Sequence, residues 1–142
     1  MTLADLRVGL RAYLLADAAI STLVGGTRIY PLRLPQGVIE PSVVYQRISG
    51  LGDHHMAGAS GLARPRMQVS CWAQSADVAT QLANLVKARI DGFRGSMLWG
   101  DNSPAEAIVV QGIFFDSERD LYDEALKLYA LSRDYLIWYE ES

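Results

Sequence analysis

Two adjacent histidines, His54 and His55, are the residues of this chain whose chemistry stands out first. Imidazole nitrogens can bind zinc or accept a proton, and Asp53 beside them could add a carboxylate oxygen. On an extended chain, however, adjacent side chains point to opposite sides, so the two histidines seldom bind one ion together. The sequence contains no third histidine, and nothing around the pair has a recognisable metal-ligand spacing. The pattern is typical of a polar loop tip, and we expect no metal or cofactor.

The same segment is rich in glycine, which raises the question of phosphate binding or nucleophilic catalysis. Residues 50–63 read GLGDHHMAGASGLA. A phosphate-binding loop leads into a helix N-terminus, whereas this segment leads into a strand pattern. Ser60 lacks the Gly-x-Ser-x-Gly pattern of a nucleophile elbow, and Cys71, the single cysteine, is typical of a small buried thiol in a strand. We therefore expect a protein that is not an enzyme.

A second polar stretch, Asp116 to Glu124, is rich in carboxylates. It resembles a calcium-binding loop only in composition, because it lacks the glycine at the sixth position and the final bidentate glutamate. We expect a solvated acidic loop.

Composition narrows the class of protein further. The 142 residues fit one domain, 1–142, with half of them hydrophobic and a fifth charged. A net charge of −3 argues against a dedicated nucleic-acid binder. No apolar run approaches the roughly 20 residues of a membrane-spanning helix, and the N-terminus lacks a signal-peptide pattern, so we expect folding in a cytoplasm and no membrane partner.

Periodicity indicates which elements position these residues. Leu6, Leu10 and Leu14 predict a first helix with one apolar face, and Asp17 can cap a second short helix that ends before Gly25. A short strand near Tyr30 and an extended, proline-rich linker should follow.

The rest of the chain alternates strands with one long helix. Strands are expected over residues 43–48 and 67–71, with the glycine-rich loop between them, and Ser75 can cap a helix that Gly92 closes. Residues 93–104 read as irregular, and a strand over 107–115 should contain a bulge at Gly112. A final strand covers 126–139. The expected fold is α+β: an antiparallel sheet of about four strands, helices packed on one face, and long loops between strands.

The final strand should present two different faces. Its helix-facing side should carry Leu131, Tyr135 and Ile137. Its outer side should carry Leu128, Leu136 and Trp138, with Trp72 of the preceding strand facing the same way. In a two-layer fold that outer side meets water unless a partner covers it. The alternative is an ordinary sheet with scattered surface aromatics, and Arg133, on the supposed inner side, makes the alternation imperfect.

Several segments, taken in their order and spacing along the chain, match the pattern of a known protein family. They are LLADAAISTLVGGTRIYPLRLPQG, PSVVYQRIS, RPRMQVSCWA, RIDGF, VQGIFFDSERDLYD and LYALSRDYLIWY. Along nearly its whole length the chain resembles the tail-terminator (tail-completion) family of long-tailed bacteriophages and gene transfer agents. None of these segments is a catalytic motif.

The resemblance implies a structural virion protein assembled in the bacterial cytoplasm. Members of the family form a ring, commonly of six copies, at the head-proximal end of the tail tube. The ring stops tube polymerisation, offers a docking surface to the neck or head-completion protein, and lets DNA pass through without specific binding. The implied partners are other copies of the chain, the major tail tube protein and the neck.

A ring requires heterologous interfaces, in which one patch of a subunit meets a different patch of its neighbour. The predicted interface combines the two loops with the outer side of the last strand. Its residues are Asp53, His54, His55, Met56, Trp72, Glu118, Arg119, Asp120, Tyr122, Leu128, Leu136 and Trp138. Two other functions stay open: a neck or head-completion protein on the portal side, and a small-molecule-binding or enzymatic domain that uses the Asp53–Met56 loop.

Overall fold

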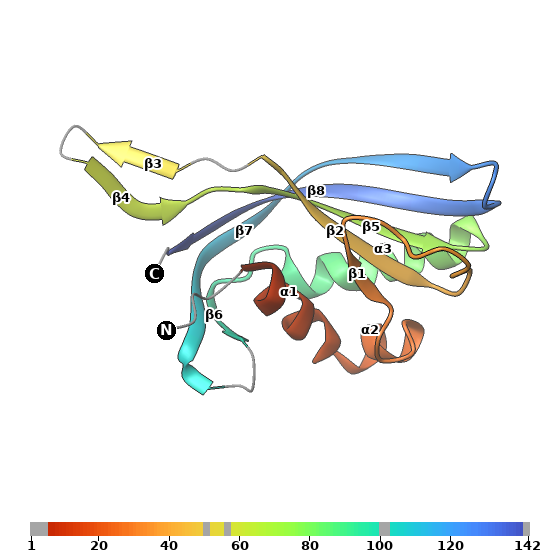
Figure 1. Cartoon of the computed structure of the whole chain (residues 1–142), viewed down its shortest axis with the longest axis horizontal. Helices are drawn as coiled ribbons and strands as arrows, with labels where there is room; N and C mark the ends of the chain where they lie inside the picture. The colour runs from red at the N-terminus through yellow and green to blue at the C-terminus, as the bar shows by residue number, and fades with distance from the viewer. Residues whose placement is uncertain (1–5, 50–51, 56–57, 100–102, 141–142) are drawn as a thin grey trace.

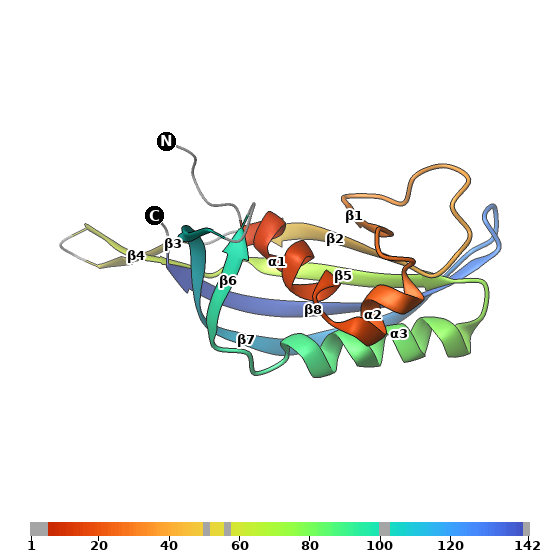
Figure 2. The ribbon, with the colours of Figure 1, turned by 90° about the horizontal axis from the view of Figure 1, so that it is seen from below.

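The structure, a computed structural model of the chain, describes residues 6–49, 52–55, 58–99 and 103–140. Helices lie against one face of a single curled sheet, which is the α+β class that the sequence predicts (Figure 1). Figure 2 shows from below that the helices cover this face. Within the described part of the chain, the helices are too short or too polar to cross a membrane.

Two short helices open the described chain. α1 (Leu6–Leu15) and α2 (Ala18–Leu23) are separated by Asp17, whose Oδ1 accepts hydrogen bonds from the backbone N–H groups of Ala19 (3.0 Å) and Ile20 (3.2 Å). These bonds satisfy N–H groups that the first turn of a helix otherwise leaves unpaired, and they confirm the predicted cap.

The long helix α3 (Ala76–Ile90) also begins where the sequence predicts. Ser75 Oγ accepts a hydrogen bond from the backbone N–H of Val78 at 3.2 Å. Gly92 follows the helix with a φ of +81°, a conformation that side chains other than glycine rarely adopt. Both the predicted cap and the predicted stop are confirmed.

The sheet is larger than predicted. Its strands are β1 (Ile29–Pro31), β2 (Ser42–Ser49), β3 (Gly52–His55), β4 (Gly58–Ala63), β5 (Arg66–Ala73), β6 (Gly95–Trp99), β7 (Ser103–Asp123) and β8 (Leu128–Glu140). In the described chain, six of them follow the order β1-β2-β5-β8-β4-β3, while β7 pairs with β8 and β6 with β7. β1 runs parallel to β2 and the other pairs are antiparallel. The four predicted strands correspond to β2, β5, β7 and β8.

The prediction of a long loop between β2 and β5 is wrong. It contains β3 and β4, which pair antiparallel; we call this hairpin, residues 52–55 and 58–63, the arm. The arm extends beyond the end of the sheet (Figure 1), and its base is held because Leu62 and Ala63 pair with the end of β8. In the hairpin, the backbone N–H and C=O groups pair with each other, whereas in a loop they would bond to water. The glycine content of the segment did not indicate this pairing.

The predicted acidic loop is also a strand. Residues 117–123 of β7 pair with residues 128–134 of β8, so the turn is confined to 124–127. We call residues 121–129, which include this turn, the tip. The register of β7 shifts between Val110 and Gly112, as expected for the predicted bulge, and again between Phe115 and Ser117. The region expected to be irregular, 93–104, contains β6 and the start of β7.

The core fills the space between the helices and the sheet. Leu10, Leu82 and Val86 from the helices and Val69, Tyr135 and Ile137 from the sheet are all buried in it. These residues occupy the helical and alternating positions that the sequence predicts, so the layer is held mainly by apolar burial.

We expect Leu10→Ala to lower the free energy of unfolding by about 2–5 kcal/mol, because the truncation leaves a cavity at a fully buried site. Val8→Ala on the same helix is the matched control. Val8 is 41% exposed, so its truncation should change the free energy by less than about 0.5 kcal/mol. Urea unfolding followed by circular dichroism measures both, and equal losses would contradict the packing described for α1.

Candidate docking surfaces

The helix-facing side of β8 holds a buried arginine. The Arg133 side chain is 9% exposed, and its Nε donates a hydrogen bond to Glu118 Oε1 of β7 at 2.8 Å. Its guanidinium also lies 5.9 Å from the centre of the Phe115 ring. The pair explains the imperfect alternation of the strand, because Glu118 neutralises a charge that the core would otherwise exclude.

Two ionisable residues near Arg133 are kept neutral. Burial raises the pKa of the Cys71 thiol to about 12, and the nearby Arg133 charge offsets only part of that rise. Burial likewise raises the pKa of the Tyr135 hydroxyl above its usual value. A thiol with so high a pKa carries almost no thiolate near neutral pH, so Cys71 is a packing residue, as predicted.

We expect Glu118→Ala to lower the free energy of unfolding by about 1–3 kcal/mol, because it leaves the buried guanidinium without its carboxylate. Asp120→Ala is the matched control. Asp120 lies two residues along the same strand, is exposed and has no ion pair within the described chain, so its effect should stay within about 0.5 kcal/mol.

The double variant Glu118→Ala/Arg133→Met should recover part of the loss, because it removes the unpaired charge together with its partner. Urea unfolding of the single and double variants gives the coupling directly. A double variant that loses as much as the sum of the single losses would show that the pair is not coupled.

The outer side of the sheet is polar at its centre. Gln46 Nε2 donates to Gln68 Oε1 at 3.3 Å, and Gln68 Nε2 donates to Ser70 Oγ at 3.3 Å. Ser70 Oγ then donates to Ser132 Oγ of β8 at 2.9 Å. This row of hydrogen bonds crosses β2, β5 and β8. The centre of the outer side is therefore polar, whereas we expected exposed aromatic side chains there.

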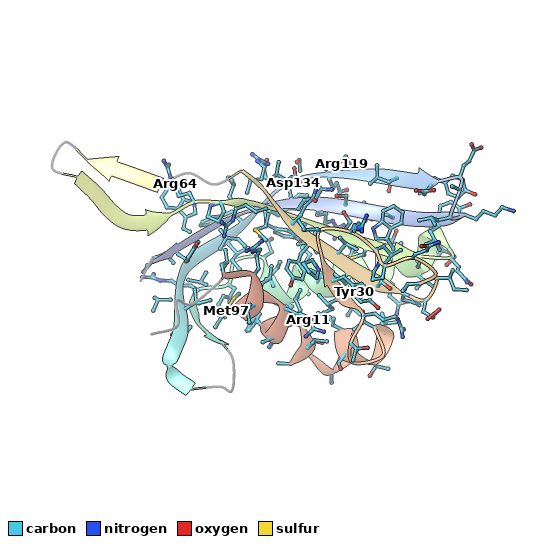
Figure 3. All side chains as sticks on the ribbon, in the orientation of Figure 1. Arg11, Tyr30, Arg64, Met97, Arg119 and Asp134 are labelled. Carbon is cyan, nitrogen blue, oxygen red and sulfur yellow. The ribbon has the colours of Figure 1, made fainter. Side chains whose placement is uncertain are left out.

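An ionic network continues the polar region across β5, β8 and β7. Arg66 is ion-paired with Asp116 and lies 3.6 Å from Asp134, while Arg119 lies 3.6 Å from the other oxygen of Asp134. Ser117 Oγ donates to Asp134 at 3.4 Å. Figure 3 shows Arg119 and Asp134 side by side on the sheet face away from the helices. The network ties three strands together at the point where β7 bulges.

Apolar side chains flank this polar region toward the arm. Phe114 is exposed, and its ring lies over Gly112, where an added Cβ would come within 2.8 Å of it. Leu136 and Trp138 are half-buried, and the Arg64 guanidinium lies 4.9 Å above the Trp138 ring. The prediction for the outer side therefore holds for part of β8 only.

The prediction that Leu128 is exposed on the outer side is wrong. It is 1% exposed, and the outer positions Ala130, Ser132 and Asp134 that follow it are buried as well. β8 is flanked by β5 and β7 in a curled sheet, so neighbouring strands shield this part of its outer face. Leu128 is a packing residue and offers no surface to a partner.

Trp72 lies where expected, on the outer side of β5, but it lines a hollow. The hollow measures about 290 Å³ and lies between the linker after β1 and the tip. Leu32 and Leu34 of the linker border it on one side, and Leu121 and Leu126 of the tip on the other. The sequence did not single out these four residues, because only the fold brings them together.

The remaining predicted residues fall into separate places. Asp53, His54 and His55 lie on β3 of the arm, and Met56 lies outside the described residues. Glu118 and Arg119 are engaged with Arg133 and Asp134, whereas Asp120 and Tyr122 are exposed near the tip. Arm and tip lie at opposite ends of the sheet, so the predicted residues form no single surface (Figure 1).

The tip carries an aromatic pair. Tyr122 and Tyr129 face each other across the hairpin with ring centroids 4.7 Å apart, and Tyr122 remains 51% exposed. Within the described residues, no group of three or more His, Cys, Asp or Glu side chains is arranged to hold a metal ion. The described surface presents exposed rings, half-buried apolar side chains and charged groups.

The sheet thus carries a projecting arm at one end and an exposed tip at the other, with no catalytic arrangement found among the described residues. Comparison with known proteins gives the family. The family model described as "Tail completion protein gp17" matches residues 8–140, so the chain belongs to this family of structural phage tail proteins. No curated protein matches the sequence.

Among solved structures, a chain of the "Virion of native gene transfer agent (GTA) particle" has the same fold. It superposes with a TM-score of 0.74 at 18% sequence identity, covering 95% of this chain and 94% of that one. At this identity the likeness concerns the fold, and it extends over nearly the full length of both chains.

Proposed function

We propose that this protein is a tail terminator: a single-domain, non-enzymatic virion protein that caps the head-proximal end of the tail tube. The observation that carries the proposal is the family match over residues 8–140. Its copies form a ring, most simply of six, that stops tube polymerisation and gives the neck a docking surface. DNA passes through the ring without specific binding, in keeping with a net charge of −3.

The shape of the chain supports this role. A ring subunit needs two different lateral contacts and further contacts along the tube axis, and the sheet offers distinct surfaces at its two ends. The same fold in a chain of a gene transfer agent virion is in keeping with a place in such a particle. The proposed interface residues are the arm with His54 and His55, the aromatic side chains Trp72 and Trp138, and the tip with Tyr122.

Deleting the arm should impair assembly without preventing folding. We expect a chain lacking residues 53–60 to fold, because Leu62 and Ala63 still pair with β8 and the core lies elsewhere. The same chain should fail to cap tubes, so that purified tube protein polymerises past its normal stop in its presence. Electron microscopy of tube lengths, with circular dichroism for the fold, measures both effects.

His54→Ala/His55→Ala provides a matched control within the arm. If the arm acts by contact, this variant should cap tubes at least partly, whereas a binding or catalytic role of the histidines predicts loss of an activity with assembly intact. Normal capping by the arm deletion would contradict the assignment of the arm.

The runner-up function is a neck or head-completion protein on the portal side. The two functions predict different positions of the protein on purified particles. Tails purified from cells that make no heads should carry a terminator, whereas a neck protein should be missing from them and present on filled heads.

A further inference from the structure

The half of β7 nearest the tip lies at a margin of the sheet. β6 pairs only with the start of β7, and the end of α3 covers the stretch that follows. There the Gly92 N–H donates to the Ile113 C=O at 2.7 Å, and Asp91 Oδ1 accepts from the Phe115 N–H at 3.0 Å. Beyond Phe115, no backbone hydrogen bond within the described chain reaches the side of β7 that faces away from β8. We call this side of residues 117–123 the open edge (Figure 1).

The register of β7 shows which backbone groups lie on the open edge. In an antiparallel ladder, successive residues direct their N–H and C=O groups alternately toward and away from the neighbouring strand. Phe115 directs its N–H away from β8, and the extra residue of the bulge turns Ser117 toward β8. Glu118, Asp120 and Tyr122 therefore point away. Their backbone groups have no partner within the described residues and can pair with one further strand.

A hollow lies beside the open edge on the helix side of the sheet. It measures about 180 Å³, with Ala76 and Thr80 of α3 on one side and Asp120 and Tyr129 on the other. Apart from Thr80 and Asp120, its lining residues are apolar or aromatic. A strand added to the open edge would direct every second side chain to this side of the sheet. A side chain with an apolar stem and a cationic end fits the hollow, because Asp120 is exposed at it.

Unpaired charge around the open edge is mostly negative. Asp120, Asp123 and Glu124 form no ion pair within the described chain. Asp77 in the first turn of α3 forms none there either, and Lys127 at the turn is an unpaired cation among these carboxylates.

The other charged groups of this region are already engaged. Ion pairs join three arginines to carboxylates: Arg133 to Glu118, Arg66 to Asp116, and Arg119 to Asp134. Lys87 Nζ lies 4.3 Å from the centre of the Phe115 ring. The charge that the open edge leaves unmatched is therefore mainly carboxylate, which favours a partner with cationic side chains.

Another copy of this chain does not match the open edge in charge. The other marginal strands of the described sheet are β1, β3 and β6, and none of the three contains a lysine or arginine. Two open edges placed against each other would bring the carboxylates of one copy close to those of the other, which is unfavourable. Charged side chains and bulges commonly protect exposed edges from pairing with themselves, and β7 has both.

We propose that the open edge takes up an extended segment of a different protein as an additional β-strand. The segment carries lysine or arginine at the positions that face the helices, where a stem enters the hollow and its charge meets Asp120. At the alternate positions it carries β-branched side chains beside Leu121. Backbone hydrogen bonds to the open edge supply the binding, and the alternating side chains supply the selectivity. The inference does not depend on the terminator role.

A short peptide that alternates lysine with valine and has blocked ends serves as the probe. At saturating peptide, the N–H groups of Glu118, Asp120 and Tyr122 should exchange with solvent at least about fivefold more slowly, because they gain hydrogen bonds. The N–H groups of Arg119 and Leu121 point toward β8 and should exchange unchanged. Two-dimensional NMR measures each amide separately.

N-methylation of the peptide tests the backbone pairing directly. Only every second N–H group of an added strand faces β7. Methyl groups on that set of amides should weaken binding at least about tenfold, because the hydrogen bonds to the open edge are lost. Methyl groups on the alternate set provide the matched control, and this peptide should still bind.

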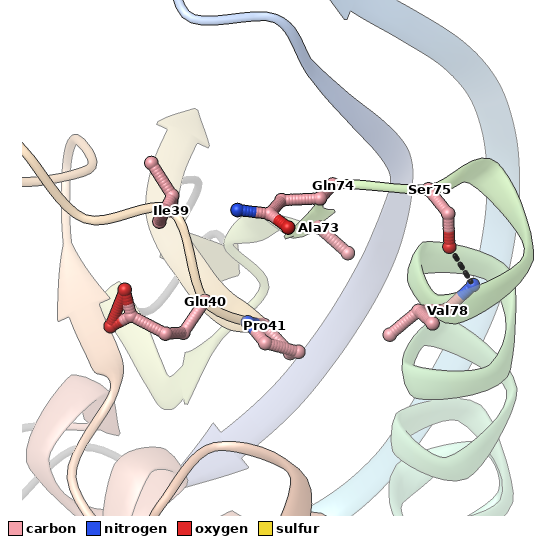
Figure 4. A pocket seen from close by; sticks show the side chains of 7 residues that line it. All are labelled: Ile39, Glu40, Pro41, Ala73, Gln74, Ser75 and Val78. Atoms are coloured by element: carbon pink, nitrogen blue, oxygen red, sulfur yellow. Dashed lines mark hydrogen bonds between the residues drawn. The ribbon is translucent and has the colours of Figure 1, made fainter.

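Asp120→Lys tests the charge and should weaken binding at least about tenfold. Glu40→Lys is the matched control, since it makes the same change in net charge. Glu40 borders a different hollow, of about 500 Å³, on the other side of the first turn of α3, together with Ile39 and Val78 (Figure 4). Its replacement should change binding by less than about twofold, because it lies away from the open edge. Circular dichroism and unaltered unfolding midpoints check that both variants fold.

A peptide that does not bind, or that binds without protecting the three amides of the open edge, would overturn the proposal. Equal losses from Asp120→Lys and Glu40→Lys, or equal effects of the two methylated sets, would do the same. Protection of these amides in the chain alone, as its concentration rises, would assign the open edge to another copy instead.

Tube capping keeps this inference apart from the proposed function. A chain that binds the peptide at its open edge and does not cap tubes refutes only the terminator role. A chain that caps tubes and leaves the three amides unprotected by the peptide refutes only the added strand.

Discussion

The backbone pairing of β8 is the interaction on which the rest of the structure depends. Its residues pair with β5 along one edge and with β7 along the other, and its end also holds β4. The helix layer, the arm and the tip are all attached to strands that β8 positions. Since both edges of the strand are occupied, its backbone groups are satisfied along most of its length, which leaves its side chains to decide what each face does.

The two faces of β8 are stabilised in different ways. The helix-facing side is apolar except for Arg133, whose charge is tolerated because Glu118 reaches it from β7. The outer side has no helix over it, and it is closed by hydrogen bonds between short polar side chains and by the ion pairs of Asp134. Because these polar groups find partners within the sheet, the outer side needs no layer of apolar side chains over it.

Local signals in the sequence were enough to predict the helices and the central strands. Asp17 and Ser75 cap their helices through contacts a few residues away, and the alternation around Val69 is decided by one buried face. The arm and the second half of β7 could not be predicted in this way, because a strand with polar residues on both sides forms only if a distant strand pairs with it. Leu128 was misjudged for the same reason: its burial comes from neighbouring strands in a curled sheet, which no local pattern encodes.

The sheet also fixes how far apart the arm and the tip lie. A 13-residue strand such as β8 spans roughly 43 Å at about 3.3 Å per residue, and its pairing on both edges makes it a stiff spacer. The direction in which the tip points relative to the arm is then set mainly by how the sheet curls between them. The two register shifts in β7, at Gly112 and after Phe115, lie on that path, and bulges increase local twist. The relative orientation of the arm and the tip therefore depends on two irregularities in one strand, because both are continuous with the paired sheet.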